Sequence, residues 1–211
     1  MAGDRKQWYE GDFYKSFIAP FLSEIRHQIK KMVTSGSNIL DIGCGTGDLE
    51  ILIAGKANQV YGIDISNKMI KTAIKMKEKS SFSNITFVNS DILDFMNNYK
   101  SKTQERFDHV IFSFCLHEMA PKMRDKVLSS VKPITEEIII ADFHKPEAAN
   151  LWGIVNTIAE SLSNLTHFTR YVDYVFTGGI ESLISKNGYQ IVEKKADSTR
   201  KFTIIRAIPI R

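Results

Sequence analysis

The sequence predicts an α/β fold, a doubly wound, mostly parallel sheet of seven strands with an antiparallel last strand. Short apolar runs alternate with amphipathic stretches of helical spacing along most of the chain, which is typical of repeated βα units. The run 136–144 is apolar almost throughout, as in a strand that is buried on both faces of a parallel sheet. The last two runs, 188–194 and 202–208, alternate apolar and polar residues, and the loop between them is short enough only for an antiparallel pair.

Composition limits the partners and the compartment. The net charge is only +4 and the lysines are scattered, so no basic surface argues for nucleic acid. The two cysteines, Cys44 and Cys115, give neither a disulfide framework nor a zinc spacing, and both are expected to be reduced thiols. No apolar run reaches the length of a membrane span or of a signal sequence, so we expect a cytoplasmic protein without stable membrane association. The residues make no prediction about oligomeric state.

The run 38–42 ends in a turn that contains Gly43, Gly45 and Gly47, after which a helical pattern begins. Glycine can adopt positive φ there and lets a ligand approach the backbone, although βα turns also carry glycine for geometry alone. The spacing Gly-x-Gly-x-Gly differs from the Gly-x-Gly-x-x-Gly of dinucleotide sites. Carboxylates on both sides of the turn would repel a pyrophosphate, so a positively charged ligand fits better; they belong to Asp41, Asp48 and Glu50.

The stretch Asp41–Gly47 resembles the first motif of class I S-adenosylmethionine-dependent methyltransferases, and the similarity to that family extends over about residues 36–208. The resemblance implies a Rossmann-like methyltransferase fold, S-adenosyl-L-methionine as cofactor and a small-molecule acceptor. The cofactor-binding residues that it implies, together with aromatic residues of the N-terminal segment, are Tyr9, Tyr14, Asp41, Gly43, Cys44, Gly45, Gly47, Asp64, Ile65, Met69, Asp91, Ile92, Ser113 and Phe114.

Two of these carboxylates follow predicted strands. Asp64 ends the run 59–64, and a carboxylate beside the glycine turn can accept both hydroxyls of a ribose. It could also cap the next helix, but Ser66 is the better N-cap, which leaves Asp64 for binding. Asp91, in the polar turn that ends the run 84–92, resembles the residue that accepts from the adenine amino group while the backbone N–H of Ile92 donates to the ring. A helix N-cap at Asp91 is compatible with that role.

We expect a single domain over 1–211, because the length suits one core and no linker or internal repeat interrupts it. Helices are predicted at about 48–55, from 67 onward, at 122–131 and at 180–186, and a fourth strand at 107–114. The expected parts are an N-terminal helical cap (1–37), a cofactor-binding half (38–145), a substrate cover (146–180) and a C-terminal helix with a hairpin (181–211).

Aromatic residues crowd the first and third of these parts. Trp8, Tyr9, Phe13 and Tyr14 precede a helical stripe over 17–33, and they can be either core or a lid over the cofactor. After a second helical stripe over 151–165, an aromatic segment precedes Gly178 and is expected to cover the substrate; its candidate substrate residues are His167, Arg170, Tyr171 and Tyr174. Residues 1–16 and 166–179 are expected to be mobile without ligand and to close over the crevice.

The candidate catalytic residues are His117, Asp142 and His144. His117 follows the fourth strand, and an imidazole there can act as a general base, with Asp142 and His144 of the fifth strand orienting it or binding the acceptor. A metal site that also includes Glu118 lacks a helical ligand spacing, so no metal is predicted. It is equally open that His117 and Glu118 only cap or pair locally.

The stretches 116–119 and 141–144 are similar to ubiquinone/menaquinone biosynthesis methyltransferases, which implies an aromatic or lipophilic acceptor. No Asn/Asp-Pro-Pro-Tyr/Phe motif follows the fourth strand, which argues against methylation of adenine or glutamine nitrogen. Two other functions stay open. One is a nucleotide-dependent oxidoreductase or epimerase with an irregular glycine loop, and the other is a non-catalytic protein that binds S-adenosylmethionine.

Overall fold

A computed structural model describes residues 19–102, 106–143, 165–196 and 202–211 of the chain. One seven-stranded sheet has the order β3-β2-β1-β4-β5-β7-β6. Strands β1 to β5 are parallel, whereas β7 is antiparallel to both of its neighbours, so the predicted fold class is confirmed. The strands are β1 (Asn38–Ile42), β2 (Gln59–Asp64), β3 (Ile85–Asn89), β4 (Phe107–Ser113), β5 (Thr135–Phe143), β6 (Tyr189–Ala196) and β7 (Phe202–Pro209).

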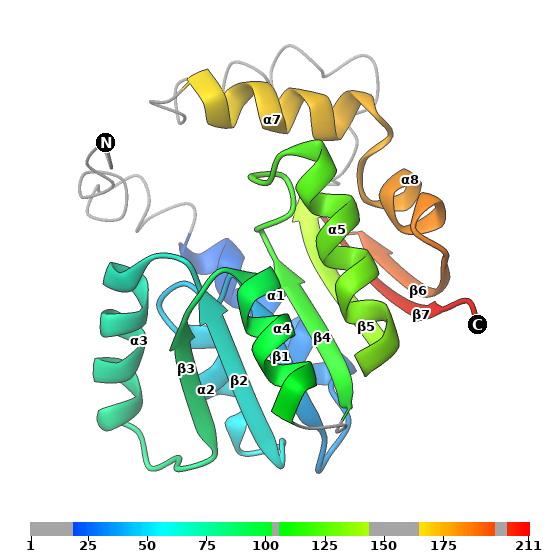
Figure 1. Cartoon of the computed structure of the whole chain (residues 1–211). Coiled ribbons are helices and arrows are strands. Elements are labelled where there is room, and N and C mark those ends of the chain that lie inside the picture. Colours follow the sequence, from blue (N-terminus) through cyan, green and yellow to red (C-terminus); the bar gives the residue numbers. More distant parts are fainter. Residues whose placement is uncertain (1–18, 103–105, 144–164, 197–201) are drawn as a thin grey trace.

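Helices cover both faces of the sheet (Figure 1). Two of them, α1 and α2, lie behind the sheet, α4 and α5 lie in front, and α3 stands beside the β3 edge. Helix α7 crosses above the upper end of α5 and continues into α8. The described helices are α1 (Ala19–Met32), α2 (Asp48–Ala54), α3 (Asn67–Glu78), α4 (Ile92–Lys102), α5 (Pro121–Val131), α7 (Leu165–Phe176) and α8 (Gly179–Lys186). None of them is long and apolar enough to cross a membrane.

Side chains alternate between the two faces along each strand, so they form two apolar cores, one on each face of the sheet. In β1, Leu40 and Ile42 belong to the core under α4, α5 and α7, whereas Ile39 belongs to the core under α1 and α2. The same two-residue period points the side chain of Asp41 toward α2. In β5, Ile138 and Ile140 face α5, and so does Asp142 by the same period. The two buried aspartates of the central strands therefore serve opposite faces of the sheet.

Strand ends differ from the predicted ones where a local conformation interrupts the ladder. Strand β4 ends at Ser113 because Phe114 adopts a φ of 53°, a left-handed conformation in which a strand does not continue. Strand β3 ends at Asn89 because the carboxylate of Asp91 already accepts from the N–H of Leu93 in the first turn of α4. Both interruptions occur at the carboxyl edge of the sheet, where ligands bind in open α/β folds.

Helix α7 is part of the main core. Tyr171, Tyr174 and Val175 are buried against residues of α5, α8 and β5. Their spacing of three and four residues places them on one face of the helix. The expected cover over 146–180 thus includes a packed helix, while residues 144–164 lie outside the described part of the chain.

Candidate active site

The glycine turn between β1 and α2 forms the floor of the site. The N–H groups of Gly43 and Cys44 both donate to the carbonyl oxygen of Ile63, which ties the turn to the end of β2. A side chain at Gly43 would collide with Cys115, because a Cβ there would lie 2.7 Å from its Cβ. At Gly45, where φ is 56°, a Cβ would meet nothing within 4 Å. Gly45 is therefore the point at which the turn opens toward a ligand.

Gly47 has a packing role instead. A Cβ at this position would lie 2.6 Å from the ring of Phe87 and 2.9 Å from the Cβ of Ala73. The residue lets the start of α2 approach α3 and β3, and it does not line the cavity described below. Of the three glycines that the sequence assigned to cofactor binding, Gly43 and Gly45 reach the cavity.

Asp64 joins the turn to the end of β2. Its Oδ2 accepts from the N–H of Gly45 at 3.0 Å, and its Oδ1 accepts from the N–H of Ser66 at 2.7 Å. Ser66 caps α3, as predicted, by accepting from the N–H of Met69. Asp64 is consequently less free than the sequence suggested, but each carboxylate oxygen keeps a further lone pair for a ligand hydroxyl.

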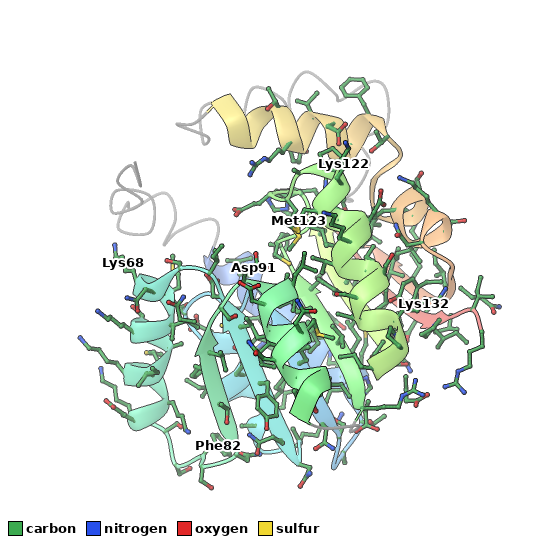
Figure 2. The ribbon with its side chains drawn as sticks, viewed as in Figure 1. Lys68, Phe82, Asp91, Lys122, Met123 and Lys132 are labelled. Carbon is green, nitrogen blue, oxygen red and sulfur yellow. The ribbon has the colours of Figure 1, made fainter. Side chains whose placement is uncertain are left out.

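Asp91 caps the start of α4 through its Oδ1, which accepts from the N–H of Leu93 at 2.8 Å. Figure 2 shows Asp91 and Met123 near each other around the upper ends of the strands, whereas Phe82 lies near the lower ends. Asp91 and Ile92 both line the cavity, so the cap and an adenine contact are geometrically compatible.

A buried pair of carboxyl groups lies beneath the turn. Asp41 and Glu50 are 1% and 0% exposed, and apart from the pair's own proton no hydrogen-bond donor reaches Asp41 Oδ1 or either oxygen of Glu50 within the described structure. Burial raises the pKa of Asp41 to about 7, and the neighbouring charge of Asp64 adds to this, while a hydrogen bond with Glu50 works in the opposite sense. Burial and then the charge of Asp41 raise the pKa of Glu50 well above its usual range. Glu50 therefore holds a proton that it shares with Asp41.

A cavity of about 480 Å³ opens at this edge of the sheet, within the size range of small-molecule sites. Among the predicted cofactor-binding residues, the following line it: Asp41, Gly43, Cys44, Gly45, Asp64, Ile65, Met69, Asp91, Ile92, Ser113 and Phe114. Tyr9 and Tyr14 lie outside the described residues. Sequence reasoning missed lining residues from α1, from the loop after β4 and from α5, namely Leu22, Arg26, Cys115, Glu118, Met119, Ala120 and Met123.

His117 and Asp142 form a dyad on the α5 side of the sheet. The ring nitrogen Nδ1 of His117 lies 2.7 Å from Asp142 Oδ1, and the N–H of His117 donates to Oδ2 at 3.2 Å. Asp142 is completely buried and also accepts from the N–H of Phe143. Burial alone would lower the pKa of His117, but the charge and hydrogen bond of Asp142 raise it above its usual value.

This geometry assigns the tautomer of a neutral His117. Because Nδ1 donates to Asp142, the lone pair lies on Nε2, to which no described residue donates. The imidazole side chain is 13% exposed but is not part of the cavity wall, where its neighbour Glu118 lies instead. His144 lies outside the described residues, so the structure brings together two of the three candidate catalytic residues.

The candidate substrate residues separate into two groups. Arg170 lines the cavity and donates from Nη1 to the carbonyl oxygen of Glu118 at 3.1 Å. Tyr171 and Tyr174 are 2% and 1% exposed, and both lie in the core behind the cavity wall. The backbone of His167 belongs to α7, and its side chain is outside the described part. Among the three of these residues whose side chains are described, Arg170 alone lines the cavity.

The fold and the site together define an α/β protein with a ligand cavity at the carboxyl edge of a parallel sheet. The family model described as a methyltransferase domain matches residues 33–197. The chain therefore belongs to the methyltransferase-domain family. The family predicted from the glycine motif is confirmed.

Individual relatives agree with this family. The ubiquinone/menaquinone biosynthesis C-methyltransferase UbiE of Vibrio cholerae is 31% identical over 174 residues, which cover 78% of this chain and 55% of the relative. The chain thus spans about half the length of that relative. Magnesium protoporphyrin IX methyltransferase from Synechocystis, solved with bound S-adenosylmethionine, has a TM-score of 0.66 at 18% identity over 96% of this chain and 88% of its own. The N-methyltransferase NodS from Bradyrhizobium japonicum has a TM-score of 0.63 at 16% identity, over 97% and 95% of the chains.

Proposed function

We propose that this chain transfers a methyl group from S-adenosyl-L-methionine to a small acceptor of aromatic or lipophilic character. One observation carries the proposal: a single cavity presents the buried carboxylate of Asp41, the open turn at Gly45 and the carboxylate of Asp64. The positively charged amino group of the cofactor fits beside Asp41, and its ribose fits beside Asp64. The bare backbone at Gly45 leaves room for a bulky part of the cofactor between them. Membership of the methyltransferase-domain family supports the same choice.

Each of these residues has a defined task in binding. Asp41 attracts the amino group of the cofactor, because a buried carboxylate without a full set of donors favours a cationic partner. Asp64 accepts the ribose hydroxyls with the lone pairs that Gly45 and Ser66 leave free. Asp91 and the N–H of Ile92 take the adenine edge. Bound S-adenosylmethionine supplies an electrophilic methyl group on a sulfonium centre.

The acceptor side of the cavity favours an apolar molecule. Met119 and Met123 line it together with Leu22 and Phe114, and methionine side chains adapt to irregular apolar shapes. Arg170 and Glu118 are the polar groups on this side. We infer an acceptor with an apolar ring or chain and a polar group at the reacting end. The names of relatives that act on quinones and porphyrins agree with that class.

His117, whose imidazole lies beside the cavity wall, is the candidate base for the proton that a hydroxyl or acidic carbon of the acceptor loses. Methyl transfer is an in-line displacement, so alignment lowers most of the barrier and a base is needed only where the acceptor must lose a proton. Asp142 orients the imidazole and makes it more basic than free histidine. Turnover should therefore rise with pH and level off above the raised pKa of His117.

The first test is a calorimetric titration with S-adenosylmethionine, S-adenosylhomocysteine and NADH. Binding of the first two without the third supports the cofactor assignment, whereas binding of NADH alone favours an oxidoreductase. A screen of quinols, other phenols and amines for formation of S-adenosylhomocysteine then identifies the acceptor class. Cofactor binding without turnover on any of these classes would leave a non-catalytic binding protein as the better description.

A further inference from the structure

Arg124, at the end of the first turn of α5, is a buried arginine that neither the cofactor nor the acceptor side of the cavity uses. The residue is 2% exposed, and arginine is rarely buried this deeply unless its donors are paired. It does not line the cavity. Its guanidinium is instead paired with groups of the protein itself.

Those contacts come from two segments that are distant in the sequence. Nε donates to the carbonyl oxygen of Leu116 at 3.0 Å, and Nη2 donates to the carbonyl oxygen of Arg170 at 2.6 Å. Nη1 forms an ion pair with Asp173 at 2.7 Å, and the guanidinium carbon lies 5.1 Å from the ring centroid of Tyr174. One side chain of α5 thus holds the loop after β4 and helix α7 at the same time.

The loop and α7 also contact each other directly. Arg170 of α7 donates to the carbonyl oxygen of Glu118 at 3.1 Å, and Nη2 of Arg124 makes a long contact of 3.5 Å with the carbonyl oxygen of His117. From the opposite side, Asp142 of β5 holds the N–H and the ring of His117. The position of His117 relative to α7 is consequently fixed at several points, of which Arg124 supplies the central one.

We propose that Arg124 is a positioning residue for methyl transfer, because it ties the loop 114–120 to α7 and so keeps His117 and Arg170 in a fixed relation to one acceptor. This inference rests on the proposed function. Arg124 does not line the cavity; it acts through Arg170, which does line it, and through His117, which lies beside the cavity wall. Removing it should affect the geometry of the acceptor side and leave the cofactor side intact.

The charge of Arg124 also bears on His117. Among the described residues, the charged groups that act on the imidazole are Asp142 of β5, Glu118 of the loop and Arg124 of α5. The two carboxylates raise the pKa of His117, and the guanidinium opposes them. The titration of His117 therefore reports whether a positive charge at position 124 stays close to the imidazole.

The test is an NMR titration of the Cε1–H group of His117, assigned with His117→Gln, together with amide exchange in the presence of S-adenosylhomocysteine. In Arg124→Met the pKa of His117 should rise by about 0.5 pH unit or more, since an opposing charge is removed. Exchange should accelerate by about tenfold in both the loop 115–120 and helix α7. Arg124→Lys should accelerate exchange while keeping the pKa near the wild-type value, because the charge stays and the planar fork is lost.

Lys186→Met is the matched control. It removes the exposed ion pair between Lys186 of α8 and Asp125, the neighbour of Arg124 in α5, and this pair includes no residue of the loop or of α7. This variant should change neither the pKa of His117 nor the exchange. Unchanged exchange in Arg124→Met, or acceleration in only one of the two segments, would overturn the proposal. If Arg124→Met does not fold, exchange in Arg124→Lys decides by the same criterion.

Failure of the proposed function would look different. A protein that does not bind S-adenosylhomocysteine in calorimetry loses the methyl-transfer assignment, whatever His117 and Arg124 do. Conversely, a protein that binds the product normally but shows no coupled response in the Arg124 variants keeps its assignment and loses the positioning role. The two results therefore cannot be confused.

Discussion

Replacing Asp64 with alanine is expected to weaken the binding of S-adenosylhomocysteine by about 10–100-fold, which corresponds to about 1.5–3 kcal/mol for the loss of charge-assisted hydrogen bonds to two ribose hydroxyls. The structure explains why the carboxylate cannot be replaced locally. Its two oxygens are aligned by the N–H groups of Gly45 and Ser66, at 3.0 and 2.7 Å, and alanine supplies no acceptor to either amide or to a ribose hydroxyl.

The same substitution removes an acceptor from two backbone amides, so a fall in stability must be separated from a loss of binding. Asp108→Ala is the matched control. Its Oδ2 accepts from the N–H of Asn38 at 2.7 Å, and it lies at the start of β4, at the opposite edge of the sheet from the cavity. Both variants should lower the melting temperature by about 2–4 °C for each kcal/mol lost, but only Asp64→Ala should change the calorimetric affinity. Equal affinities in Asp64→Ala and wild type would remove Asp64 from the site.

Three further substitutions test other parts of the account. Gly45→Ala should lower the free energy of unfolding by about 1 kcal/mol, because alanine is strained at a positive φ, and it should abolish tight binding of S-adenosylhomocysteine. Gly47→Ala should lower the free energy of unfolding further, as measured in urea, because its Cβ would also collide with Ala73. Since burial raises the pKa of Asp41 from an ordinary 3.8 to about 7, the folded state holds the proton more tightly than the unfolded state. The free energy of unfolding should therefore fall as pH rises from about 4 to about 7 and then level off, a slope that Asp41→Asn should reduce. Affinity for the cationic cofactor should rise over the same interval, and a flat profile in calorimetry would refute this. His117→Gln, measured once an acceptor is known, should keep its cofactor affinity and lose about 100-fold in turnover at neutral pH, with a smaller deficit at higher pH; full turnover would leave alignment as the whole mechanism.

Features of the site that depend on consecutive residues could be predicted from the sequence. The glycine turn, Asp64 and Asp91 all lie at or just after the ends of strands, and parallel strands end at one edge of a sheet, so their positions in the sequence were enough to bring them together. The dyad of His117 and Asp142 follows from the same rule, because β4 and β5 are neighbours in the sheet.

Residues contributed by helices could not be predicted in this way. Leu22 and Arg26 of α1, and Met123 of α5, reach the cavity only because of how those helices pack on the two faces of the sheet. Their spacing in the sequence is that of ordinary amphipathic helices. The pairing of Glu50 with Asp41 was hidden for a similar reason, since the rotation of α2 brings Glu50 beneath β1.

The aromatic segment before Gly178 carried a signal that the sequence reasoning did not use. Tyr171, Tyr174 and Val175 are spaced by three and four residues, which is the spacing of a buried helix face. Aromatic density alone suggested a cover over the substrate. Helical periodicity would have separated these core residues from Arg170, which lies at the cavity.

Methyl transfer itself is the central claim, and it is measured most directly with S-adenosylmethionine labelled in its methyl group. The purified protein is incubated with pools of quinols, other phenols and amines, and both S-adenosylhomocysteine and the label in the small-molecule fraction are quantified. Equal amounts of the two products are expected in at least one apolar pool, with a strong reduction in Asp64→Ala at limiting cofactor. Label that stays on the bound cofactor in every pool, or that moves to protein or RNA, would contradict this claim.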